Sequence, residues 1–416
     1  MYNPCCLMST LPYKPKIVND PVHGFMRIPT ALCLSLIEHP WFQRLRWIRQ
    51  LGLAHFVYPG AQHTRFQHAI GAMHLMDQVI DVLRSKGCDI NDAEAEAVMV
   101  AILLHDIGHG PFSHALETSI VTGYSHESLS LLFMEALNEE TGGRLSLAID
   151  IFTNRYPKRF LHQLVSGQLD MDRLDYLKRD SFFTGVVEGV VSSDRILKML
   201  TVCYDELAVE AKGIYSIEKF LIARRLMYWQ VYYHKTAVSA EMLLIRILER
   251  ARLLAGEGEK LFATPALSFF LNGPEEGSAA QPLRLYAALS DDDILVSVKA
   301  WVQHPDKVLS LLCSAFMSRK LFRTEIQTNP FDEEILARRR KTISAAYAIP
   351  LKEAEYFVFQ GRIENHAYDP DSAQILIQMK DGSLADIYEV SDMENLAGLA
   401  KMVEKHYLCY PKEGNF

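Results

Sequence analysis

The sequence predicts a mainly α-helical fold with small β hairpins and a small α+β element at its C-terminal end. The first observation is helical periodicity: between residues 66 and 83, apolar side chains recur every three or four positions. The second is the run Val98 to Leu104, which is apolar throughout and typical of a buried helix. The third is that strand-like alternation is confined to short segments beside turn-forming residues. A helical core with minor β structure accounts for all three.

The expected elements begin with a short hairpin or ordered loop over 17–28, where Asn19-Asp20-Pro21 and His23-Gly24 supply turn residues. Helical patterning follows and occupies most of the chain as far as residue 253. The expected helices cover 41–51, 66–83, 93–106, 111–121, 125–138, 172–180, 192–201 and 216–253. Before the last of these, residues 202–215 alternate around Lys212-Gly213 and predict a small hairpin.

The chain changes character after residue 260. The turn-rich segment 271–278 predicts an exposed insertion, and helices are then expected to about residue 349. Strands are expected over 356–363, 374–379 and 384–390, with Asp381-Gly382 as a hairpin turn, and a last helix near 392–406. We therefore expect four regions, which are a disordered tail (1–13), a helical domain with the candidate catalytic residues (14–260), a helical extension (261–350) and an α+β subdomain (351–416).

Composition narrows the class of protein. The chain has 416 residues, of which 49% are hydrophobic and 23% charged, as in ordinary globular proteins. The net charge of -8 argues against broad nucleic-acid binding, which needs a basic surface. The seven cysteines are scattered without a CxxC pair, which fits a reducing cytoplasm. No stretch approaches the roughly 20 apolar residues of a membrane span, and the first residues do not resemble a signal peptide.

The segment that follows the apolar run carries the clearest chemistry. His105 and Asp106 come directly after Leu104, and Gly108 and Gly110 end the expected helix. Burying an Asp beside a His is costly unless something pairs with the charge, and a divalent metal does so most economically because it binds both groups. His68 and Asp172 lie on two other expected helices. These residues predict one N2O2 metal site, suited to Fe, Mn, Mg or Zn: His68, His105, Asp106 and Asp172.

The metal motif has further matching segments around it. They are Asn19-Asp20-Pro21-Val22-His23-Gly24, Phe42-Gln43-Arg44-Leu45-Arg46, Gln50-Leu51-Gly52, Pro59-Gly60-Ala61, Arg65-Phe66-Gln67-His68, His126-Glu127, Leu169 to Tyr176 and Tyr232-Tyr233-His234-Lys235. Together they resemble the HD-domain phosphohydrolases. Within that superfamily they are most similar to the deoxynucleoside triphosphate (dNTP) triphosphohydrolases, in the branch of the SAM- and HD-domain catalytic domain and its bacterial relatives. The resemblance is specific from about residue 19 to 235 and faint beyond 260.

This resemblance implies a helical HD-domain core and a reaction. The metal held by the four ligands would polarise the α-phosphate of a dNTP, and water would displace the nucleoside and release triphosphate. A further Mg would accompany the nucleotide. His114 and Glu117 are three residues apart on an expected helix, so the carboxylate would raise the pKa of the imidazole and suit it to proton transfer. The implied catalytic residues are His109, His114, Glu117 and His126.

The resemblance also implies contacts with nucleotides. Arg65, Arg173 and Arg224 would bind the triphosphate, because guanidinium groups match phosphate oxygens. The residues implied at the sugar and the base are Gln50, Leu51, Tyr176, Asp180 and Tyr232. Some relatives are activated by a nucleotide at a subunit interface, and parts of that site are matched by Lys16, Asn19, Gln43 and Arg46. An activating nucleotide and a homodimer or homotetramer are therefore expected.

Other readings stay open. The chain could be a different HD phosphohydrolase, such as a nucleotidase or a phosphodiesterase, or a nucleotide-binding protein without catalysis. His105 could be a helix-terminal histidine that bonds only a backbone carbonyl. His74, on the same expected helix as His68, is expected to be a core or surface residue. Arg338-Arg339-Arg340-Lys341 is expected to form the solvated face of a helix.

Overall fold

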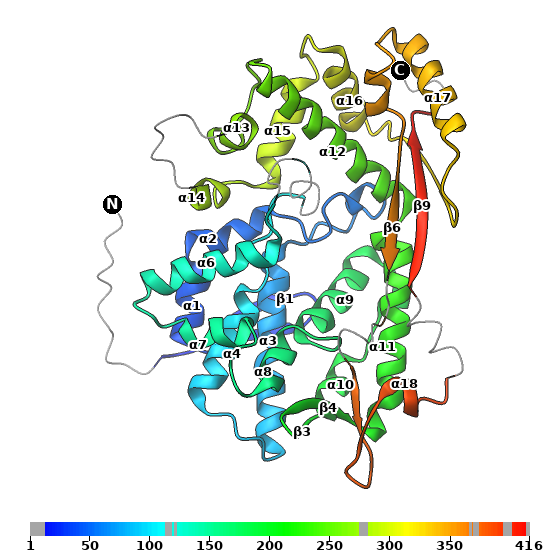
Figure 1. Ribbon diagram of the computed structural model, residues 1–416. Coiled ribbons are helices and arrows are strands. Elements are labelled where there is room, and N and C mark those ends of the chain that lie inside the picture. The colour runs from blue at the N-terminus through cyan, green and yellow to red at the C-terminus, as the bar shows by residue number, and fades with distance from the viewer. Residues whose placement is uncertain are drawn as a thin grey trace.

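The computed structural model describes residues 13–112, 119, 123–273, 282–365, 368, 374–393 and 402–412. Helices dominate this part of the chain, and small sheets lie at its margins (Figure 1), so the predicted fold class is confirmed. Among these residues no helix has the length and apolar character needed to cross a membrane. The expected helix 111–121 and the insertion 271–278 fall mostly outside the described residues.

Three helices form the centre of the molecule. α3 (Arg65–Ser85) packs against α4 (Asp92–Leu104) and α9 (Met171–Thr184). Both α3 and α4 begin with a hydrogen-bonded cap. The Gln67 side chain accepts a hydrogen bond from the Thr64 amide at the start of α3, and the side chains of Asn91 and Glu94 each accept from the other's backbone amide at the start of α4. The apolar run of α4 is buried throughout, as predicted.

The helices around this centre depart from the expected pattern in two places. The expected helix 41–51 is wrong in its second half, because Ile48 is extended and Arg49 forms a β-bridge with Thr64. The expected helix 216–253 is interrupted by a π-helical turn (η5, Tyr228–Tyr232), after which His234 caps a new helix. The elements are α1 (Ala31–Glu38), α2 (Pro40–Gln43), η1 (Arg44–Trp47), η2 (Ala54–Phe56), α6 (His126–Glu140), α7 (Ser146–Phe152), α8 (Arg159–Val165), η3 (Val187–Gly189), α10 (Ser193–Met199), α11 (Ile214–Met227) and α12 (Lys235–Gly256).

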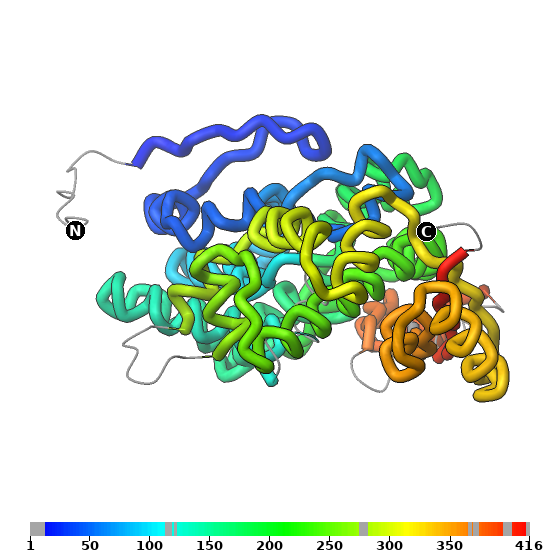
Figure 2. The backbone as a smooth tube through the Cα atoms, turned by 90° about the horizontal axis from the view of Figure 1, so that it is seen from above, coloured from blue at the N-terminus to red at the C-terminus, as the bar shows by residue number. Residues whose placement is uncertain are grey.

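Two hairpins confirm the short β segments of the first half. β1 (Lys16–Asp20) pairs with β2 (Gly24–Ile28) and runs along one side of the helical body (Figure 2). β3 (Leu200–Cys203) pairs with β4 (Glu206–Glu210). The second turn lies at Tyr204-Asp205, where both residues have positive φ, and the expectation of a turn at Lys212-Gly213 is wrong. Those residues form η4 (Ala211–Gly213) instead.

The C-terminal part of the chain returns to earlier strands. β7 (Leu376–Gln378) pairs in parallel with β4 and antiparallel with β8 (Leu384–Asp386). β9 (Val403–Tyr410) lies between β5 (Arg323–Gln327) and β6 (Phe359–Asn365). The expectation of helix at 403–406 is therefore wrong, and β5 was not expected. The accompanying helices are α13 (Pro265–Asn272), α14 (Pro282–Tyr286), α15 (Asp291–Trp301), α16 (Lys307–Met317), α17 (Glu333–Tyr347), η6 (Glu353–Tyr356) and α18 (Ile387–Val390). The division into four regions stays a prediction.

Candidate metal centre and substrate site

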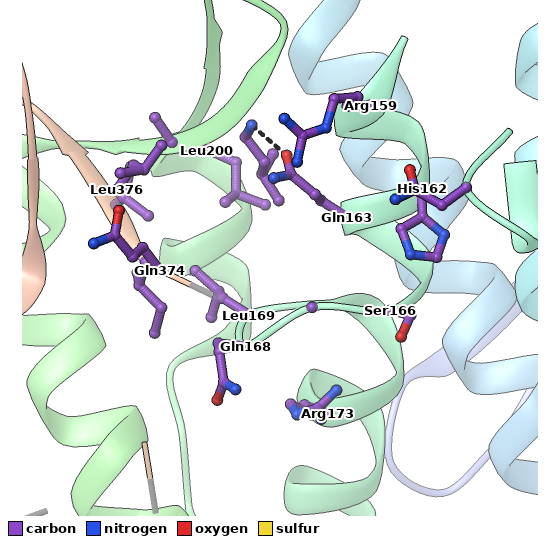
Figure 3. Close-up of a pocket in the computed structure, with 16 residues that line it drawn as sticks. Arg159, His162, Gln163, Ser166, Gln168, Leu169, Arg173, Leu200, Gln374 and Leu376 are labelled. Carbon is purple, nitrogen blue, oxygen red and sulfur yellow. Dashed lines mark hydrogen bonds between the residues drawn. The ribbon is translucent and has the colours of Figure 1, made fainter. Parts of the chain in front are cut away.

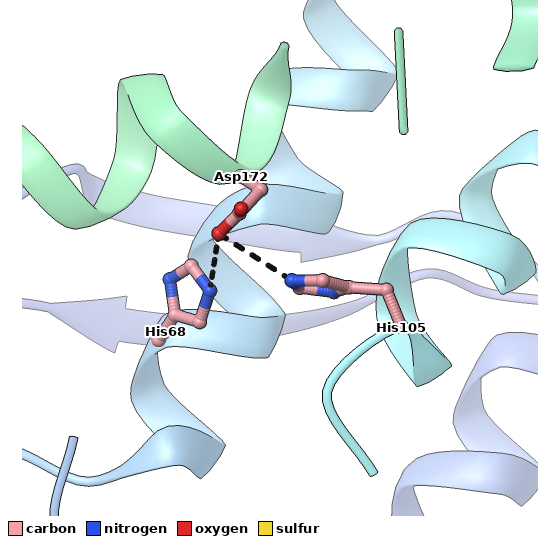
Figure 4. Close-up of side chains that lie close together, drawn as sticks. All are labelled: His68, His105 and Asp172. Carbon is pink, nitrogen blue, oxygen red and sulfur yellow. Dashed lines mark ion pairs between the residues drawn. The ribbon is translucent and has the colours of Figure 1, made fainter. Parts of the chain in front are cut away.

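The three central helices bring two histidines and an aspartate to one point (Figure 4). His68 lies in the first turn of α3, His105 follows the last residue of α4, and Asp172 lies in the first turn of α9. Their ligand atoms all lie within 4.8 Å of one another. The Nε2 atoms of His68 and His105 are 3.1 Å and 3.4 Å from Asp172 Oδ1. This cluster can hold a metal ion.

The far sides of both imidazole rings are anchored. His105 Nδ1 donates to the Ile102 carbonyl over 2.6 Å, and His68 Nδ1 donates to Asp175 Oδ2 over 2.8 Å. With the proton on Nδ1, each neutral ring presents a lone pair on Nε2. Both Nε2 atoms are buried, and both are turned toward the Asp172 carboxylate. Anchoring of one ring nitrogen while the other is left for a ligand is typical of metal-binding histidines, so the residues present fit a divalent metal.

Asp106 borders this cluster and is also held by other groups. Its Oδ2 is 2.5 Å from Arg65 Nη1 and 3.7 Å from His68 Nε2. Its Oδ1 is 3.4 Å from His105 Nε2 and 3.3 Å from His109 Nε2. Burial alone would raise the pKa of Asp106, but His105, His109 and Arg65 hold it well below its usual value. Asp106 is thus an ionised carboxylate beside the metal cluster, and its role as a fourth ligand stays a prediction.

The local charge favours a cation at this point. Burial alone would lower the pKa of His68, but the carboxylates of Asp172 and Asp175 together raise it to about 10. The pKa of Asp172 is lowered against the effect of burial, chiefly by the two histidines. Carboxylates that stabilise a charged imidazole would stabilise a divalent metal in the same place.

A second layer of charged residues supports His68, and sequence reasoning missed it. Asp175 Oδ1 accepts from His23 Nε2 over 2.7 Å, while Arg179 Nε donates to Asp175 Oδ2 over 2.9 Å. Arg179 Nη1 also donates to Asp20 over 2.8 Å. All of these side chains are almost fully buried. The available signal was the i, i+3 spacing of Asp172 and Asp175, which places both carboxylates on the same side of α9.

The turn that carries Asp106 is fixed from behind by three side chains. Arg44 Nη2 donates to the Ile107 carbonyl over 2.6 Å, and the Tyr286 hydroxyl donates to the Gly108 carbonyl over 2.8 Å. The Ser130 hydroxyl donates to the His105 carbonyl over 2.6 Å. Gly108 is required at this turn, because a Cβ there would lie 2.3 Å from the Ser130 amide nitrogen. The turn that carries Asp106 is therefore positioned by residues from three other parts of the chain.

Two of the four expected catalytic residues can be placed. The rings of His109 and His126 stack with their centroids 4.0 Å apart and an interplanar angle of 13°. Burial and, secondarily, the charge of Arg65 lower the pKa of His109 to about 3, so that its ring is neutral near neutral pH. His114 and Glu117 lie outside the described residues.

The three arginines expected to bind phosphate have different surroundings, and the cavity that two of them adjoin is not lined by the proposed metal ligands. Arg65 contacts Asp106, as described. Arg173 pairs with the buried Asp170 and lines a cavity of about 340 Å³, drawn in Figure 3. Arg224 Nη1 donates over 2.9 Å to Gln168 Oε1, and Gln168 lines the same cavity. The Nε atoms of Arg173 and Arg224 are buried without a hydrogen-bond partner in the described parts of the chain. These arginines retain donors suited to an anion.

The residues expected at the sugar and base form a connected group. The Tyr232 hydroxyl donates to Asp180 Oδ2 over 2.8 Å, and the other oxygen of Asp180 accepts from His63 Nε2 over 2.7 Å. The Tyr176 ring lies 6.2 Å from that of Tyr232 and 6.5 Å from that of His68, so it joins this group to the metal cluster. His63 was not predicted, because no local pattern links it to Asp180.

Gln50 and Leu51 lie in the extended loop after η1, next to the start of α3. The Gln50 amide donates to the His63 carbonyl over 3.0 Å, which places this loop beside the residues that precede Arg65. The side-chain Oε1 of Gln50 is buried and, among the described residues, has no hydrogen-bond partner. Leu51 is half-buried against the core. Gln50 therefore offers an acceptor that a bound molecule could use.

The four residues expected to bind a regulatory nucleotide lie away from the metal cluster, on the hairpin β1–β2 and on the α2–η1 segment. Lys16 pairs with Glu38 over 3.0 Å, and Asn19 is exposed on β1. Gln43 accepts from Arg46 Nε over 2.7 Å, and the Arg46 guanidinium lies 3.5 Å from the centre of the Phe66 ring. That these residues bind an activating nucleotide stays a prediction.

Comparison with known proteins agrees with this geometry. The HD domain family matches residues 65–180, which include all four expected metal ligands, and the HD associated region matches 191–260. A phosphohydrolase from Bacteroides thetaiotaomicron of known crystal structure is 55% identical, with a TM-score of 0.92, covering 96% of this chain and 100% of that one. A hypothetical protein from Aquifex aeolicus is 27% identical, with a TM-score of 0.70 and coverage of 96% and 97%.

The chain belongs to the HD-domain phosphohydrolase superfamily.

Curated relatives extend this family assignment. The uncharacterized protein YwfO of Bacillus subtilis is 34% identical over 325 residues, which is 76% of this chain and 73% of that protein. The deoxynucleoside triphosphate triphosphohydrolase SAMHD1 homolog of Dictyostelium discoideum is 32% identical over 248 residues, and human SAMHD1 is 29% identical over 264. The matches cover 55% and 53% of this chain, but only 48% and 42% of those two proteins. The relatives named as dNTP triphosphohydrolases therefore match about half of this chain and less than half of their own length.

Proposed function

We propose that this protein is a metal-dependent phosphohydrolase that converts a dNTP into a deoxynucleoside and inorganic triphosphate. The observation that carries the proposal is the pair of buried imidazole Nε2 atoms that face the Asp172 carboxylate, with the Arg65 guanidinium beside them. A metal site next to a buried arginine suits hydrolysis of a phosphate ester or anhydride. The choice of a dNTP is supported by the resemblance of the motifs and by the relatives that are named dNTP triphosphohydrolases.

The proposed metal ligands are His68, His105 and Asp172, with Asp106 as the fourth. A divalent metal there would supply Lewis acidity to a phosphate oxygen. Arg65, which contacts Asp106 Oδ2, is proposed to bind the phosphates of the substrate. Arg173 and Arg224 are proposed to bind the remaining phosphates, because each retains a buried Nε donor.

Proton transfer is assigned to separate residues. His109 is neutral, because its pKa is lowered to about 3, so it is proposed to orient a phosphate oxygen rather than to donate a proton. His126, which stacks on His109, would hold that ring in place. His114 with Glu117 is proposed to give the leaving nucleoside its proton. In this reaction water attacks the α-phosphorus, the bond from phosphorus to the 5′ oxygen breaks, and the nucleoside leaves as an alcohol.

The nucleoside end is assigned to the group around Asp180. Its carboxylate is shared between His63 and Tyr232, which fixes its two oxygens beside the Tyr176 ring. Tyr176 and Asp180 are proposed to contact the sugar. Tyr232, Gln50 and Leu51 are proposed to line the part of the site that holds the base and the sugar. A fixed, hydrogen-bonded carboxylate next to aromatic rings can orient a nucleoside at small cost in side-chain entropy.

The experiment is a substrate panel in ¹⁸O-labelled water. The protein is loaded with Mn²⁺ or Mg²⁺ and given each dNTP, each ribonucleoside triphosphate, nucleoside monophosphates and a cyclic dinucleotide. We expect equal amounts of deoxynucleoside and triphosphate, with ¹⁸O in the triphosphate. Asp172→Asn should abolish turnover, and Asp194→Asn, which changes an exposed carboxylate on α10, should not.

Each other outcome has a definite meaning. Release of orthophosphate or pyrophosphate from a dNTP would contradict the proposed reaction. Turnover of a monophosphate or a cyclic dinucleotide alone would make the protein a different HD phosphohydrolase. Metal binding and nucleotide binding without turnover of any compound would make it a nucleotide-binding protein without catalysis.

A further inference from the structure

One buried carboxylate outside the segments matched by the HD domain and the HD associated region reaches the proposed active site. Asp291 is the first residue of α15 and only 1% of its surface is exposed. Its Oδ2 accepts from the Arg49 amide over 3.0 Å, and its Oδ1 accepts from the Phe112 amide over 3.1 Å. Residues 49 and 112 are far apart in the sequence, so a single side chain ties together three separate parts of the chain.

The first of these amides belongs to the loop that carries Gln50 and Leu51. Arg49 is bridged to Thr64, and the Arg65 amide donates to the Ile48 carbonyl over 3.0 Å. The segment 48–50 therefore lies along the residues that lead into α3. Whatever holds Arg49 also holds the loop of Gln50 and the approach to Arg65, both of which are proposed to contact the substrate.

The second amide belongs to the segment between His109 and the expected proton-transfer pair. Phe112 has a positive φ of 49°, a backbone conformation that non-glycine residues seldom adopt and that needs support from its surroundings. The Gln50 loop and the segment that contains Phe112 also lie close together. A Cβ built on Gly52 would be 4.0 Å from the Phe112 Cα atom. Asp291 thus accepts from the backbone at a strained position next to the proposed catalytic residues.

Asp291 is not needed to begin its own helix. The Ser290 amide already donates to Asp293 Oδ2 over 2.7 Å, and the Ser290 hydroxyl bonds the same oxygen. Burying the Asp291 carboxylate is costly, and within the described residues its one charged partner is the Arg49 guanidinium, 3.3 Å from Oδ2. Burial accordingly raises its pKa to about 6 despite the two amide bonds and Arg49. A carboxylate kept at this cost is explained by the two segments that it holds.

We propose that Asp291 is a positioning residue, whose carboxylate holds the Gln50 loop and the segment after His109 in the arrangement that substrate binding and proton transfer require. The helical extension that follows residue 260 would then be part of the active-site scaffold. A second contact supports this, because the Tyr286 hydroxyl on α14 donates to the Gly108 carbonyl, in the turn just before His109. The inference rests on the proposed function, because its kinetic test measures hydrolysis of the dNTP substrate.

The test compares Asp291→Asn with Asp292→Asn. Both remove one negative charge from the first turn of α15, but Asp292 is exposed. An Asn at position 291 keeps one oxygen acceptor and turns an NH₂ group toward the second amide, so that amide is left unbonded. We expect Asp291→Asn to lower kcat/KM by about tenfold or more, through both a lower kcat and a higher KM. Asp292→Asn should stay within about twofold of the unmodified protein.

Two further measurements separate positioning from general stability. The metal content of Asp291→Asn should match that of Asp292→Asn, whereas amide hydrogen exchange should become faster in the peptides that contain Arg49 and Phe112. Unchanged kcat, KM and exchange in Asp291→Asn would overturn the proposal. If the unmodified protein hydrolyses no compound of the panel, the proposed function fails, and unchanged exchange in Asp291→Asn would then overturn the tie between the two segments independently.

Discussion

At the scale of single residues, the metal site depends on which ring nitrogen of each histidine is anchored. The Ile102 carbonyl and the Asp175 carboxylate accept hydrogen bonds from the Nδ1–H groups, and this leaves Nε2 of His105 and His68 for a metal. The sequence alone predicted the ligand types, because a His-Asp pair after a buried run is costly without a partner. It missed Asp175, although the i, i+3 spacing from Asp172 was a usable signal, and it could not predict His63, since no local pattern links His63 to Asp180.

Replacing Asp175 should weaken metal binding without touching a proposed ligand. Asp175→Asn keeps an oxygen that His68 Nδ1 can reach, but it removes the charge that raises the basicity of that imidazole. We expect the affinity for Mn²⁺ to fall by roughly 10- to 100-fold. The measurement is a competition titration against a fluorescent chelator on folded, metal-free protein, with Asp194→Asn as the control. Equal affinities in the two variants would contradict a supporting role for Asp175.

At the scale of elements, the site exists because α3, α4 and α9 approach closely. Apolar periodicity predicted α3 and the unbroken apolar run predicted α4, with ends within two residues of the observed ones. The expected helix 41–51 failed for a tertiary reason, since the β-bridge from Arg49 to Thr64 outweighs local helical spacing. The hairpin turn was predicted at the wrong place because Gly213 is a typical turn residue. The observed turn needs positive φ at Tyr204 and Asp205, which the residue pair does not indicate as clearly as a glycine does.

The close approach of α3 and α9 can be tested at Gly71. A Cβ there would lie 2.1 Å from Asp175 Oδ1 and 2.3 Å from Arg179 Nη2, both in a buried ion pair. Gly71→Ala should lower the free energy of unfolding by about 1–3 kcal/mol, although alanine favours a helix by about 1 kcal/mol. Gly256→Ala, at the open end of α12, is the matched control and should be neutral or slightly stabilising. The measurement is the free energy of unfolding in urea. A Gly71→Ala variant that is more stable than the unmodified protein would mean that α3 and α9 lie farther apart than in this structure.

The docking of α15 gives a pH dependence with a definite sign. Asp291 has a pKa of about 6 in the folded protein against an ordinary value of 3.8, because burial disfavours its charge. Between these values the folded state holds the proton that the unfolded state has lost, so the contribution of Asp291 to stability should decrease as pH rises from about 4 to about 6. The two-unit difference corresponds to roughly 3 kcal/mol.

This contribution should be absent in Asp291→Asn. The unfolding free energy of Asp291→Asn, measured in urea at several pH values, should therefore rise relative to that of the unmodified protein between about pH 4 and about pH 6, whereas the Asp292→Asn curve should stay parallel to it. Parallel curves for all three proteins across this interval would show that Asp291 ionises with an ordinary pKa.

At the scale of the whole molecule, the end of the chain completes structure begun much earlier. β7 extends the hairpin β3–β4, and β9 is the middle strand between β5 and β6. Sequence patterning predicted strands at 356–363, 374–379 and 384–390, and β6, β7 and β8 overlap them. It was wrong at 387–390, which form α18, and at 403–406, which it assigned to a helix. The pairing of β9 with residues 323–327 and 359–365 is long-range, and no local pattern encodes it.

Removing β9 should therefore affect more than the tail. A chain that ends at Met402 leaves β5 and β6 without the strand that joins them and exposes the apolar surface that Leu408 and Cys409 cover. We expect this truncation to lower the melting temperature and to aggregate, because unpaired strand edges recruit other chains. A chain that ends at Lys412 is the control. Size-exclusion chromatography and thermal melts that do not distinguish the two truncations would contradict this account of the sheet.

The most direct measurement is the metal content of the folded protein and of two histidine variants. Elemental analysis after equilibration with Mn²⁺ and gel filtration should find one tightly bound metal per chain in the unmodified protein. His105→Ala should lose it, since the ring contributes one of the two buried Nε2 atoms. His74→Ala, which changes another histidine of α3 that bonds Gln78, should keep it. A His105→Ala protein that retains as much metal as the unmodified one would contradict the proposed centre.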